Sequence, residues 1–386
     1  MNKKRIPLYF AASMLYWAAQ YIYVPTLPAY VKAAVASLTA VGVVLSMYGL
    51  WSAILRIPTG IIVDATGRTK AFLVGGFLLA AVGALIMGRG GSVGALTFGR
   101  ALTGASTATW VPVMVVFAGF FPPEKTVFAT SLLAISTSLG QVIATGSTGF
   151  LNQVGGYPLA FFVGAGLAVA ASVLIASVRI PRTDSALPRT VSARSIMKIF
   201  ARSDVLLPSF ASAVCQFGVW AVVFAFLPLL ARELGAGPIL VSLLMTTNLV
   251  ANTAANLFST LGVKKTNQRP ILFGSFAVFA AGAILAAAAR SVPLLFAATS
   301  LMGIANGVFY PVLLGLSIEQ VDSPHRTTAM GIHQAVYALG MFAGPWIGGI
   351  LADALGIRAM FGVIAGFCVA AASLLVVLRP SPAPIR

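Results

Sequence analysis

Charge is what this 386-residue chain has least of. Lys, Arg, Asp and Glu together make up 9% of its residues, whereas 59% are hydrophobic. A soluble domain of this length needs a more polar surface than such a composition supplies. Acidic residues are the scarcest charged group, with 8 against 25 basic residues, so the formal net charge is +17 at pH 7. The composition therefore indicates a membrane protein.

Cysteine and histidine are also scarce, with 2 of each. Cys215 and Cys368 fall inside long apolar runs in different halves of the chain, so they predict neither a disulfide framework nor a metal cluster. The sequence contains no nucleophile–base set, which argues against a membrane enzyme, and no phosphate-binding loop, which excludes an ATP-driven pump formed by this chain alone. We therefore expect no cofactor and no metal site. A receptor or scaffold that does not transport remains an alternative.

Long apolar runs, in contrast, are abundant. Twelve runs of roughly 20 residues follow one another, and each is long enough to cross a bilayer as a helix. We expect an all-α membrane protein with spans near residues 7–31, 38–62, 71–89, 93–118, 126–150, 156–179, 205–231, 238–262, 270–289, 292–318, 326–350 and 356–379. The first run is too long for a signal peptide and lacks a small-residue cleavage site, so we expect it to be retained.

The basic residues are distributed unevenly over the loops between these runs. With the N-terminus in the cytoplasm, eighteen of the 25 lie in cytoplasmic segments, five lie on the opposite side, and Arg56 and Arg100 lie inside spans. This positive-inside pattern predicts a multi-pass protein of the cell inner (plasma) membrane with both termini in the cytoplasm. It argues against nucleic acid as a partner, and anionic lipid headgroups are the expected contacts of the basic loops.

The chain resembles itself at an offset of about 200 residues. The matches are Gly140 with Gly340, Gly149 with Gly349, Leu27-Pro28 with Leu227-Pro228, and Gly104 with Gly303. Together they predict two six-helix halves, residues 1–180 and 205–386, in the same orientation and related by a pseudo-twofold axis. Residues 181–204 form the expected cytoplasmic linker, which is basic and contains prolines. Two parallel halves around a midplane site are the layout of a secondary transporter.

The loop after the second span carries the sharpest motif. It reads Gly60-Ile-Ile-Val-Asp64-Ala-Thr-Gly67-Arg68-Thr-Lys70. Glycines permit a tight turn, and the acid and the basic residues can stabilise helix ends and so bias the inward-open and outward-open states. This spacing resembles the loop 2–3 motif of the major facilitator superfamily. Ala65 stands where that family has a basic residue directly after the acid, which suggests a weaker latch, and an ordinary positive-inside loop is the alternative.

Two further elements resemble the twelve-helix drug:proton antiporter branch of that superfamily. Pro25-Thr-Leu-Pro28 ends the first span, and Arg100-Ala-Leu-Thr-Gly104 lies in the fourth. The branch's fifth-span motif, Gly-Pro-x-x-Gly-Gly, is poorly kept at residues 144–149 and occurs instead at residues 344–349. The resemblance implies export of small organic molecules by alternating access, coupled to protons. Uptake or facilitated exchange of an organic anion or metabolite is the alternative that the arginines favour.

No carboxylate falls near the middle of a predicted span. The intramembrane charges are Arg56 and Arg100, so the pathway is expected to favour neutral, amphipathic or anionic compounds over dications. We interpret Arg100 as a cavity or proton-relay residue, with a structural hydrogen bond to backbone carbonyls as the alternative. His333, in the eleventh span, titrates near physiological pH and is the candidate proton carrier, unless it is a neutral histidine hydrogen-bonded between helices.

Polar and aromatic residues mark the expected substrate pathway. In the family that the chain resembles, spans 1, 4, 7 and 10 line the central path, and here these spans supply Trp17, Gln20, Tyr21, Trp110, Gln216, Trp220, Asn306 and Tyr310. Such side chains combine stacking surface with oriented hydrogen bonds, as a small-molecule site requires, and helix packing is the alternative for each. Asn248, Asn252 and Asn256 share one helix face and are expected to hydrogen-bond between helices. We expect a monomer.

Overall fold

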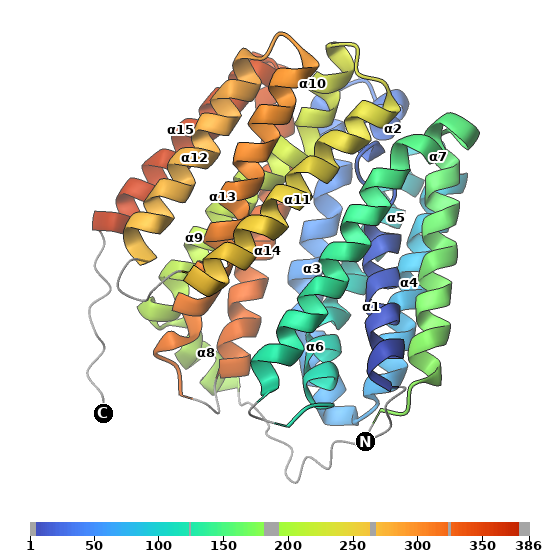
Figure 1. Cartoon of the computed structure of the whole chain (residues 1–386), viewed down its shortest axis with the longest axis vertical. Helices are drawn as coiled ribbons and strands as arrows, with labels where there is room; N and C mark the ends of the chain where they lie inside the picture. Colours follow the sequence, from blue (N-terminus) through green and yellow to red (C-terminus); the bar gives the residue numbers. More distant parts are fainter. Residues whose placement is uncertain (1–4, 123–124, 181–192, 263–267, 323–325, 378–386) are drawn as a thin grey trace. The chain divides into compact units, whose positions relative to one another are not determined.

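The computed structural model describes residues 5–122, 125–180, 193–262, 268–322 and 326–377, and every regular element within those ranges is helical (Figure 1). In chain order the α-helices are α1 (Arg5–Tyr21), α2 (Leu27–Ala34), α3 (Leu38–Thr66), α4 (Thr69–Arg89), α5 (Val93–Ser106), α6 (Trp110–Ala118), α7 (Thr126–Ser177), α8 (Ala193–Phe200), α9 (Ser203–Val219), α10 (Leu227–Glu233), α11 (Pro238–Gly262), α12 (Gln268–Ala288), α13 (Val292–Glu319), α14 (Arg326–Leu355) and α15 (Ile357–Val377). A 3-10 turn (Thr107–Thr109) joins α5 to α6, and a π-helical segment (Trp220–Phe226) joins α9 to α10.

The helices confirm the all-α membrane fold expected from the apolar runs. Within the described ranges, 9 helical segments are long and apolar enough to cross a membrane, judged by length and composition. One of them, α7, contains two of the predicted spans, because Gly155 and Gly156 leave the helical conformation and Pro158 follows. Gly156 has a φ of 69°, which a glycine adopts without strain. The first predicted span is divided between α1 and α2, and the last corresponds to α15, whose described apolar part is shorter.

Two helices break at equivalent places in the two halves of the sequence. Both α2 and α10 begin at a Leu-Pro pair, Leu27-Pro28 and Leu227-Pro228, with the proline in the first turn. Proline has no backbone N–H to donate and its ring clashes with the preceding turn, so a continuous helix cannot pass through it without distortion. A turn precedes the first pair and the π-helical segment precedes the second. The sequence repeat thus has a counterpart in local structure.

The chain divides into two compact units. Unit 1 comprises Met1–Val35, Leu50–Thr190 and Gly237–Thr246, and unit 2 comprises Ala36–Gly49, Val191–Ala236 and Thr247–Arg386. Two helices belong to both, because the first part of α3 is in unit 2 and the first part of α11 is in unit 1. The units therefore differ from a simple division of the sequence into two halves. Ala36–Gly49 of the first half belongs to unit 2, and Gly237–Thr246 of the second half belongs to unit 1.

Repeated glycines place the helices of each unit in close contact. In unit 1, a Cβ on Gly140 would overlap the carbonyl of Met14 in α1, and one on Gly149 would lie 2.5 Å from Cα of Ile239 in α11. Small residues at such positions let two helix backbones approach each other, as is common in membrane proteins. The glycines of α7 therefore fix where α1 and the start of α11 pack.

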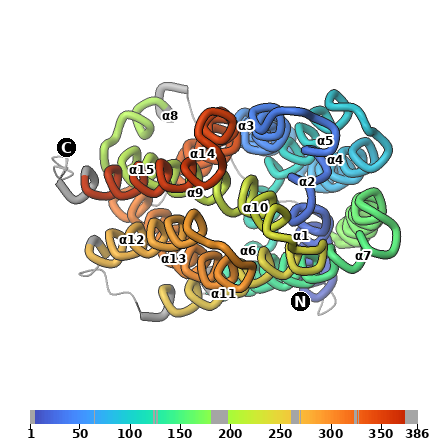
Figure 2. Tube along the Cα trace, turned by 90° about the horizontal axis from the view of Figure 1, so that it is seen from above, coloured from blue at the N-terminus to red at the C-terminus, as the bar shows by residue number. Residues whose placement is uncertain are grey.

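Unit 2 repeats this arrangement with the equivalent glycines. A Cβ on Gly340 would overlap the carbonyl of Ala213 in α9, and one on Gly349 would lie 2.6 Å from the carbonyl oxygen of Leu38 in α3. Figure 2 shows α14 beside α9 within this unit, and the two helices are in contact. In both units, the first glycine of the pair contacts the first long helix of its own sequence half. The second contacts the start of α11 or α3.

An acidic side chain of α14 caps the start of α3 in unit 2. The carboxylate of Asp353 accepts hydrogen bonds from the backbone N–H groups of Leu38 and Thr39, each at 2.8 Å, and from the Thr39 hydroxyl at 2.6 Å. Ser37 Oγ accepts a further bond from the N–H of Ala40 at 3.0 Å. These contacts satisfy three of the N–H groups that the first turn of a helix leaves without an intrahelical acceptor.

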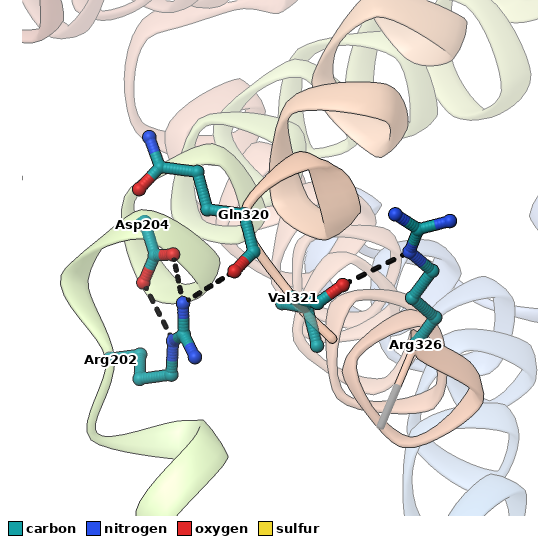
Figure 3. Close-up of polar contacts among 5 residues, drawn as sticks. All are labelled: Arg202, Asp204, Gln320, Val321 and Arg326. Atoms are coloured by element: carbon teal, nitrogen blue, oxygen red, sulfur yellow. Dashed lines mark hydrogen bonds and ion pairs between the residues drawn. The ribbon is translucent and has the colours of Figure 1, made fainter. Parts of the chain in front are cut away.

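Polar contacts fix the start of α9 against the end of α13 (Figure 3). Arg202 donates two hydrogen bonds to the Asp204 carboxylate, at 3.0 and 2.7 Å, and one to the carbonyl of Gln320 at 2.9 Å. Arg326 donates to the carbonyl of Val321 at 3.0 Å. The hydrogen bond to Asp204 raises the pKa of Arg202, so this guanidinium stays charged at any physiological pH. An apolar cluster packs in the same region: Ile199, Val205, Val321, Ala329 and Ile332.

Candidate functional site

Unit 1 contains a buried polar cluster between α1 and α5. The amide nitrogen of Gln20 donates to Ser106 Oγ at 2.7 Å, to the Tyr16 hydroxyl at 3.1 Å and to the carbonyl of Thr103 at 3.2 Å. The hydroxyl oxygens of Tyr16 and Ser106 lie 2.8 Å apart. These side chains are at most 1% exposed. A buried network with this many mutual contacts holds each polar group in one orientation.

Arg100 lies beside this cluster on α5 and is only 2% exposed. The Tyr23 hydroxyl, which donates to Gln20 Oε1 of the cluster at 3.5 Å, lies close enough to the Arg100 guanidinium to interact with it electrostatically. Arg100 is predicted to act as a cavity or relay residue or to hydrogen-bond to backbone carbonyls, and its burial is compatible with either role. A guanidinium removed from water attracts negative charge strongly, because the surrounding medium screens it little. The position therefore suits recognition of an anionic or electron-rich group.

Arg56, the second arginine inside a predicted span, belongs to a separate chain of contacts in unit 1. It is 5% exposed, and its Nη2 donates to Ser52 Oγ at 3.1 Å. Ser52 Oγ lies 3.0 Å from the Thr107 hydroxyl. Thr107 follows Ser106 directly, so the Arg56 chain and the Gln20 cluster meet at two consecutive residues. The structure thus brings Arg56, Arg100 and Gln20 into one region of unit 1.

Aromatic side chains of α1 and α6 lie together in the same unit. The rings of Trp17 and Trp110 have centroids 5.0 Å apart and meet edge to face. The Trp17 ring is also 5.9 Å from that of Tyr21 and 5.7 Å from that of Tyr16. Trp17, Tyr21 and Trp110 are all half-buried. Aromatic side chains that are not fully buried are suited to stacking on an aromatic or apolar group of a ligand.

His333 is fully buried in unit 2, with 0% exposure. Its Nδ1 lies 3.2 Å from Ser209 Oγ and its Nε2 lies 3.1 Å from Ser212 Oγ, so both ring nitrogens contact hydroxyl groups of α9. The ring of Tyr337, one turn further along α14, has its centroid 6.2 Å away. Both of the roles predicted for His333, proton carrier and interhelical hydrogen-bonding group, agree with this geometry.

The other predicted pathway residues of unit 2 lie on α9, the π-helical segment and α13. Gln216 and Trp220 are buried, at 8% and 6% exposure, and Trp220 stacks on Tyr48 with centroids 5.1 Å apart. Asn306 and Tyr310 are half-buried on α13, and the Tyr310 ring is 5.8 Å from the Tyr337 ring. Tyr310 is thereby linked through Tyr337 to His333.

The asparagine stripe of α11 behaves as predicted at its first member. Asn248 donates from Nδ2 to the carbonyl of Thr299 in α13 at 2.9 Å, which confirms an interhelical hydrogen bond there. Asn252 and Asn256 are half-buried further along the helix.

The loop motif spans the end of α3 and the start of α4. Gly67 has a φ of 61°, the left-handed conformation that the turn between the two helices requires. Arg68 and Lys70 are exposed, and Gly60 is half-buried within α3. The backbone of Asp64 is helical, whereas its side chain lies outside the described part of the structure.

Sequence analysis missed the hydroxyl groups that hold the candidate residues. Ser209 and Ser212 on α9 contact His333, and Tyr16 and Ser106 contact Gln20. The available signal was the spacing of Ser209 and Ser212, three residues apart in an apolar run, which places both on one helix face. The spacing alone does not say which neighbouring helix that face meets.

No metal cluster occurs among the residues that the structure describes, where no group of three or more His, Cys, Asp or Glu side chains is assembled.

Known proteins resemble the chain in sequence. The family model for the Major Facilitator Superfamily matches residues 9–230 and again residues 208–386. The inner membrane transport protein YajR of Escherichia coli (strain K12) is 31% identical over 109 residues, which is 28% of this chain and 24% of that protein. An uncharacterized MFS-type transporter of Mycobacterium tuberculosis (strain ATCC 25618 / H37Rv) is 28% identical over 173 residues, 42% of this chain and 24% of the relative. The chain thus spans about a quarter of the length of the curated relatives it matches.

Solved structures resemble the chain over nearly its whole length. The nucleoside transporter NupG has a TM-score of 0.79 at 13% identity, with 98% of this chain and 99% of that chain covered. The human organic anion transporter MFSD10 has a TM-score of 0.72 at 15% identity, covering 97% and 99%. A bacterial homolog of the human lysosomal transporter Spinster has a TM-score of 0.77 at 14% identity, covering 96% and 95%. At these identities the likeness shows the fold alone. With the family model matched across both halves of the sequence, the chain belongs to the major facilitator superfamily, whose members are secondary transporters of small molecules and not enzymes.

Proposed function

We propose that this protein exports small organic molecules by alternating access and couples that export to protons. The observation that carries the proposal is His333, a titratable group fully buried in α14 with hydroxyl groups at both ring nitrogens. Burying an ionisable group inside a membrane span costs free energy, so such a group is interpreted as functional. Histidine is the side chain best suited to exchange protons near neutral pH. The export direction is supported by the Pro25–Pro28 element, which resembles that of the antiporter branch.

The positions of the carboxylates leave His333 as the leading proton carrier. Four of the described acids lie near helix ends: Asp204 in the first turn of α9, Glu233 and Glu319 as the last residues of α10 and α13, and Asp353 two residues before the end of α14. Asp322 is exposed and follows α13 outside any helix. Protons carried through the middle of a membrane span require a titratable group there. Within the described chain, His333 is the histidine that meets this requirement.

The substrate that we propose is neutral, amphipathic or anionic. Arg56 and Arg100 both lie buried in unit 1, near the cluster of Gln20 and Ser106. At about 8 Å and an effective dielectric constant of about 20, each guanidinium would repel a substrate cation by roughly 2 kcal/mol. Two such contributions disfavour a monocation by more than a hundredfold. The half-buried side chains of Trp17 and Trp110 would accept an aromatic or apolar part of the same molecule.

The proposal is tested by transport in proteoliposomes with an imposed pH gradient, using neutral, cationic and anionic compounds. The central variant is His333→Gln, which preserves hydrogen bonding but carries no proton. The matched control is His325→Gln, because His325 is the other histidine of the chain. We expect His333→Gln to retain exchange but to lose its response to the gradient, and His325→Gln to behave like the parent protein. A gradient response that survives in His333→Gln would show that protons are carried elsewhere.

A second candidate function is uptake or facilitated exchange of an organic anion or metabolite. The two buried arginines of unit 1 favour it, because a fixed positive charge assists an anion without any coupled proton. Counterflow of labelled anions without a pH gradient distinguishes the two functions. Parent protein that exchanges anions at equal rates with and without a gradient would support this second function and overturn proton-coupled export.

The same proposal includes a topology. We propose two six-helix halves, residues 1–180 and 205–386, in one inner-membrane monomer with both termini in the cytoplasm, supported by the repeat and by the distribution of the basic residues. Fusion of a reporter protein to each end measures this orientation directly. Reporter activity on the outer side at either end would contradict it.

A further inference from the structure

The hydrogen bonds around His333 are unequal, and the difference lies in the two serines of α9. Ser209 Oγ lies 2.6 Å from the carbonyl oxygen of Val205 and 3.2 Å from Nδ1 of the histidine. Ser212 Oγ lies 3.1 Å from Nε2. A serine hydroxyl has one proton to donate and two lone pairs with which to accept.

The proton of Ser209 is committed to the backbone. A distance of 2.6 Å between a hydroxyl oxygen and a carbonyl oxygen requires a proton between them, because two acceptors at that separation would repel each other. Ser209 therefore donates to Val205 and can only accept from His333. Because an acceptor faces Nδ1, that nitrogen must carry a proton.

The other ring nitrogen is then an acceptor as long as the imidazole is neutral. A neutral imidazole holds one proton, so with Nδ1 protonated Nε2 presents a lone pair. The hydroxyl of Ser212 faces that lone pair and supplies the donor. Both nitrogens are thereby satisfied in one tautomer, and the opposite tautomer would aim an unprotonated Nδ1 at an oxygen that has no proton to give.

We infer that Ser209 holds His333 in the Nδ1–H tautomer and that the transported proton binds at Nε2. The hydroxyl of Ser212 then changes from a hydrogen-bond donor to an acceptor at Nε2. Ser209 and Ser212 are positioning residues in this scheme. The role of this scheme in proton coupling rests on the proposed function, whereas the assignment of the His333 tautomer does not.

The proton step balances without any further reactant. A proton from water forms an N–H bond at Nε2 and converts neutral imidazole to imidazolium, while Nδ1–H stays bonded to Ser209. The Ser212 hydroxyl rotates, so that its oxygen accepts from Nε2–H instead of donating to it. Release of the proton reverses each of these changes.

The groups around the ring leave this exchange to the serines. The titratable side chain nearest on α14 is Tyr337, with Tyr310 of α13 behind it. The described charged residues of the packed elements lie near their ends: Lys198 on α8, Arg202 and Asp204 at the start of α9, Glu319 at the end of α13, Arg326 and Asp353 at the two ends of α14, and Arg358 at the start of α15. Among the described titratable groups, His333 is therefore the candidate to bind a proton in the middle of α14, because the described carboxylates lie near helix ends or outside the helices.

Nitrogen-15 NMR of ring-labelled histidine tests the inference directly. The chain has 2 histidines, so a His325→Gln background leaves His333 as the single labelled residue in reconstituted full-length protein. The shift of each ring nitrogen separates a protonated from an unprotonated state. At alkaline pH we expect Nδ1 protonated and Nε2 unprotonated. On acidification we expect the Nε2 signal to change and the Nδ1 signal to stay.

Two serine variants make the test sharper, because they should differ. Ser209→Ala removes the acceptor at Nδ1, so the tautomer ratio should shift toward Nε2–H by roughly tenfold, the effect of one hydrogen bond. Ser212→Ala, the matched control, removes the same atom from the same helix and should keep the Nδ1–H tautomer. An Nε2–H parent spectrum, or equal effects of the two variants, overturns the inference.

The outcomes also separate this inference from the proposed function. If the spectra show the Nδ1–H tautomer while transport ignores a pH gradient, the proposed coupling is wrong and the assigned tautomer stands. If transport responds to the gradient through His333 while the parent spectrum shows Nε2–H, the coupling stands and the assignment of Ser209 is wrong. A response to the gradient in Ser212→Ala that equals that of the parent protein overturns the role of Ser212 as the group that changes from donor to acceptor.

Discussion

Replacing Asp353 should weaken the start of α3 and destabilise unit 2. The carboxylate accepts bonds from the N–H groups of Leu38 and Thr39 and from the Thr39 hydroxyl, at 2.6 to 2.8 Å. The first turn of a helix has no intrahelical acceptors for these groups, and its end of the helix dipole is positive. In Asp353→Ala, water must take over all three bonds and the favourable charge is lost.

The size of the loss follows from these contacts. Removal of a capping side chain costs about 0.5–2 kcal/mol, and a carboxylate near a helix N-terminus adds about 0.3–1 kcal/mol through the dipole. We therefore expect Asp353→Ala to lower the unfolding free energy by about 1–3 kcal/mol. Asp353→Asn keeps one acceptor oxygen and loses the charge, so it should cost about half as much.

Thermal unfolding with a thiol-reactive fluorophore measures this effect in the unit concerned. Cys215 and Cys368 are both free and buried, and both belong to unit 2, so the dye reacts when that unit opens. The matched control is Glu233→Gln, at an exposed acid that ends α10 in the same unit. We expect the melting temperature to decrease in the order Glu233→Gln, Asp353→Asn, Asp353→Ala. An Asp353→Ala protein that melts with the control would show that the bonds to α3 contribute nothing beyond hydration.

Three further substitutions test other parts of the structure. Arg100→Ala should reduce transport at least tenfold and Arg100→Lys should restore it only in part, because lysine keeps the charge without the planar fork of donors; normal transport by Arg100→Leu would contradict a role in the pathway. Asp64→Asn should slow transport while the yield of monodisperse protein stays the same, and an unchanged rate would remove the latch interpretation of the loop motif. Gly340→Leu should lower the unfolding free energy by at least about 1–3 kcal/mol, because the introduced side chain would overlap the Ala213 carbonyl. Gly362→Leu, where a Cβ meets nothing within 4 Å, is its control, and equal melting temperatures would count against the close contact.

The fold could be predicted from the sequence because its signals are local. Each apolar run reports a span by its length, and the prolines of Leu27-Pro28 and Leu227-Pro228 report where a helix breaks. The glycine matches reported contacts as well, since Gly340 and Gly349 lie on helix backbones where no side chain fits. The partners of those glycines were not predictable, because close approach specifies a small residue and leaves its neighbour undetermined.

The candidate site was predicted less completely, for a related reason. Arg56, Arg100 and His333 stand out because charge or titratable groups are rare inside apolar runs. The partners of Arg56 and His333 are serines, and serines also occur throughout the helices with their hydroxyls bonded to the preceding turn, as in Ser209. The sequence does not distinguish a hydroxyl that serves a neighbouring helix from one that serves its own backbone. That distinction requires the pairing of α9 with α14.

The chemistry of the two candidate groups assigns them different tasks. Arginine side chains are in general permanently charged, so Arg100 suits the attraction of a negative group and not the carrying of protons. In the proposed function, the imidazole of His333 exchanges a proton and is neutral for part of the cycle, so it is a poor permanent attractant for an anion. Arg100 lies in unit 1 and His333 in unit 2. If substrate binding and proton binding are divided in this way, a change at Arg100 should alter which compounds are transported and leave the pH response in place. A change at His333 should do the opposite. A single residue that governed both properties would refute the division.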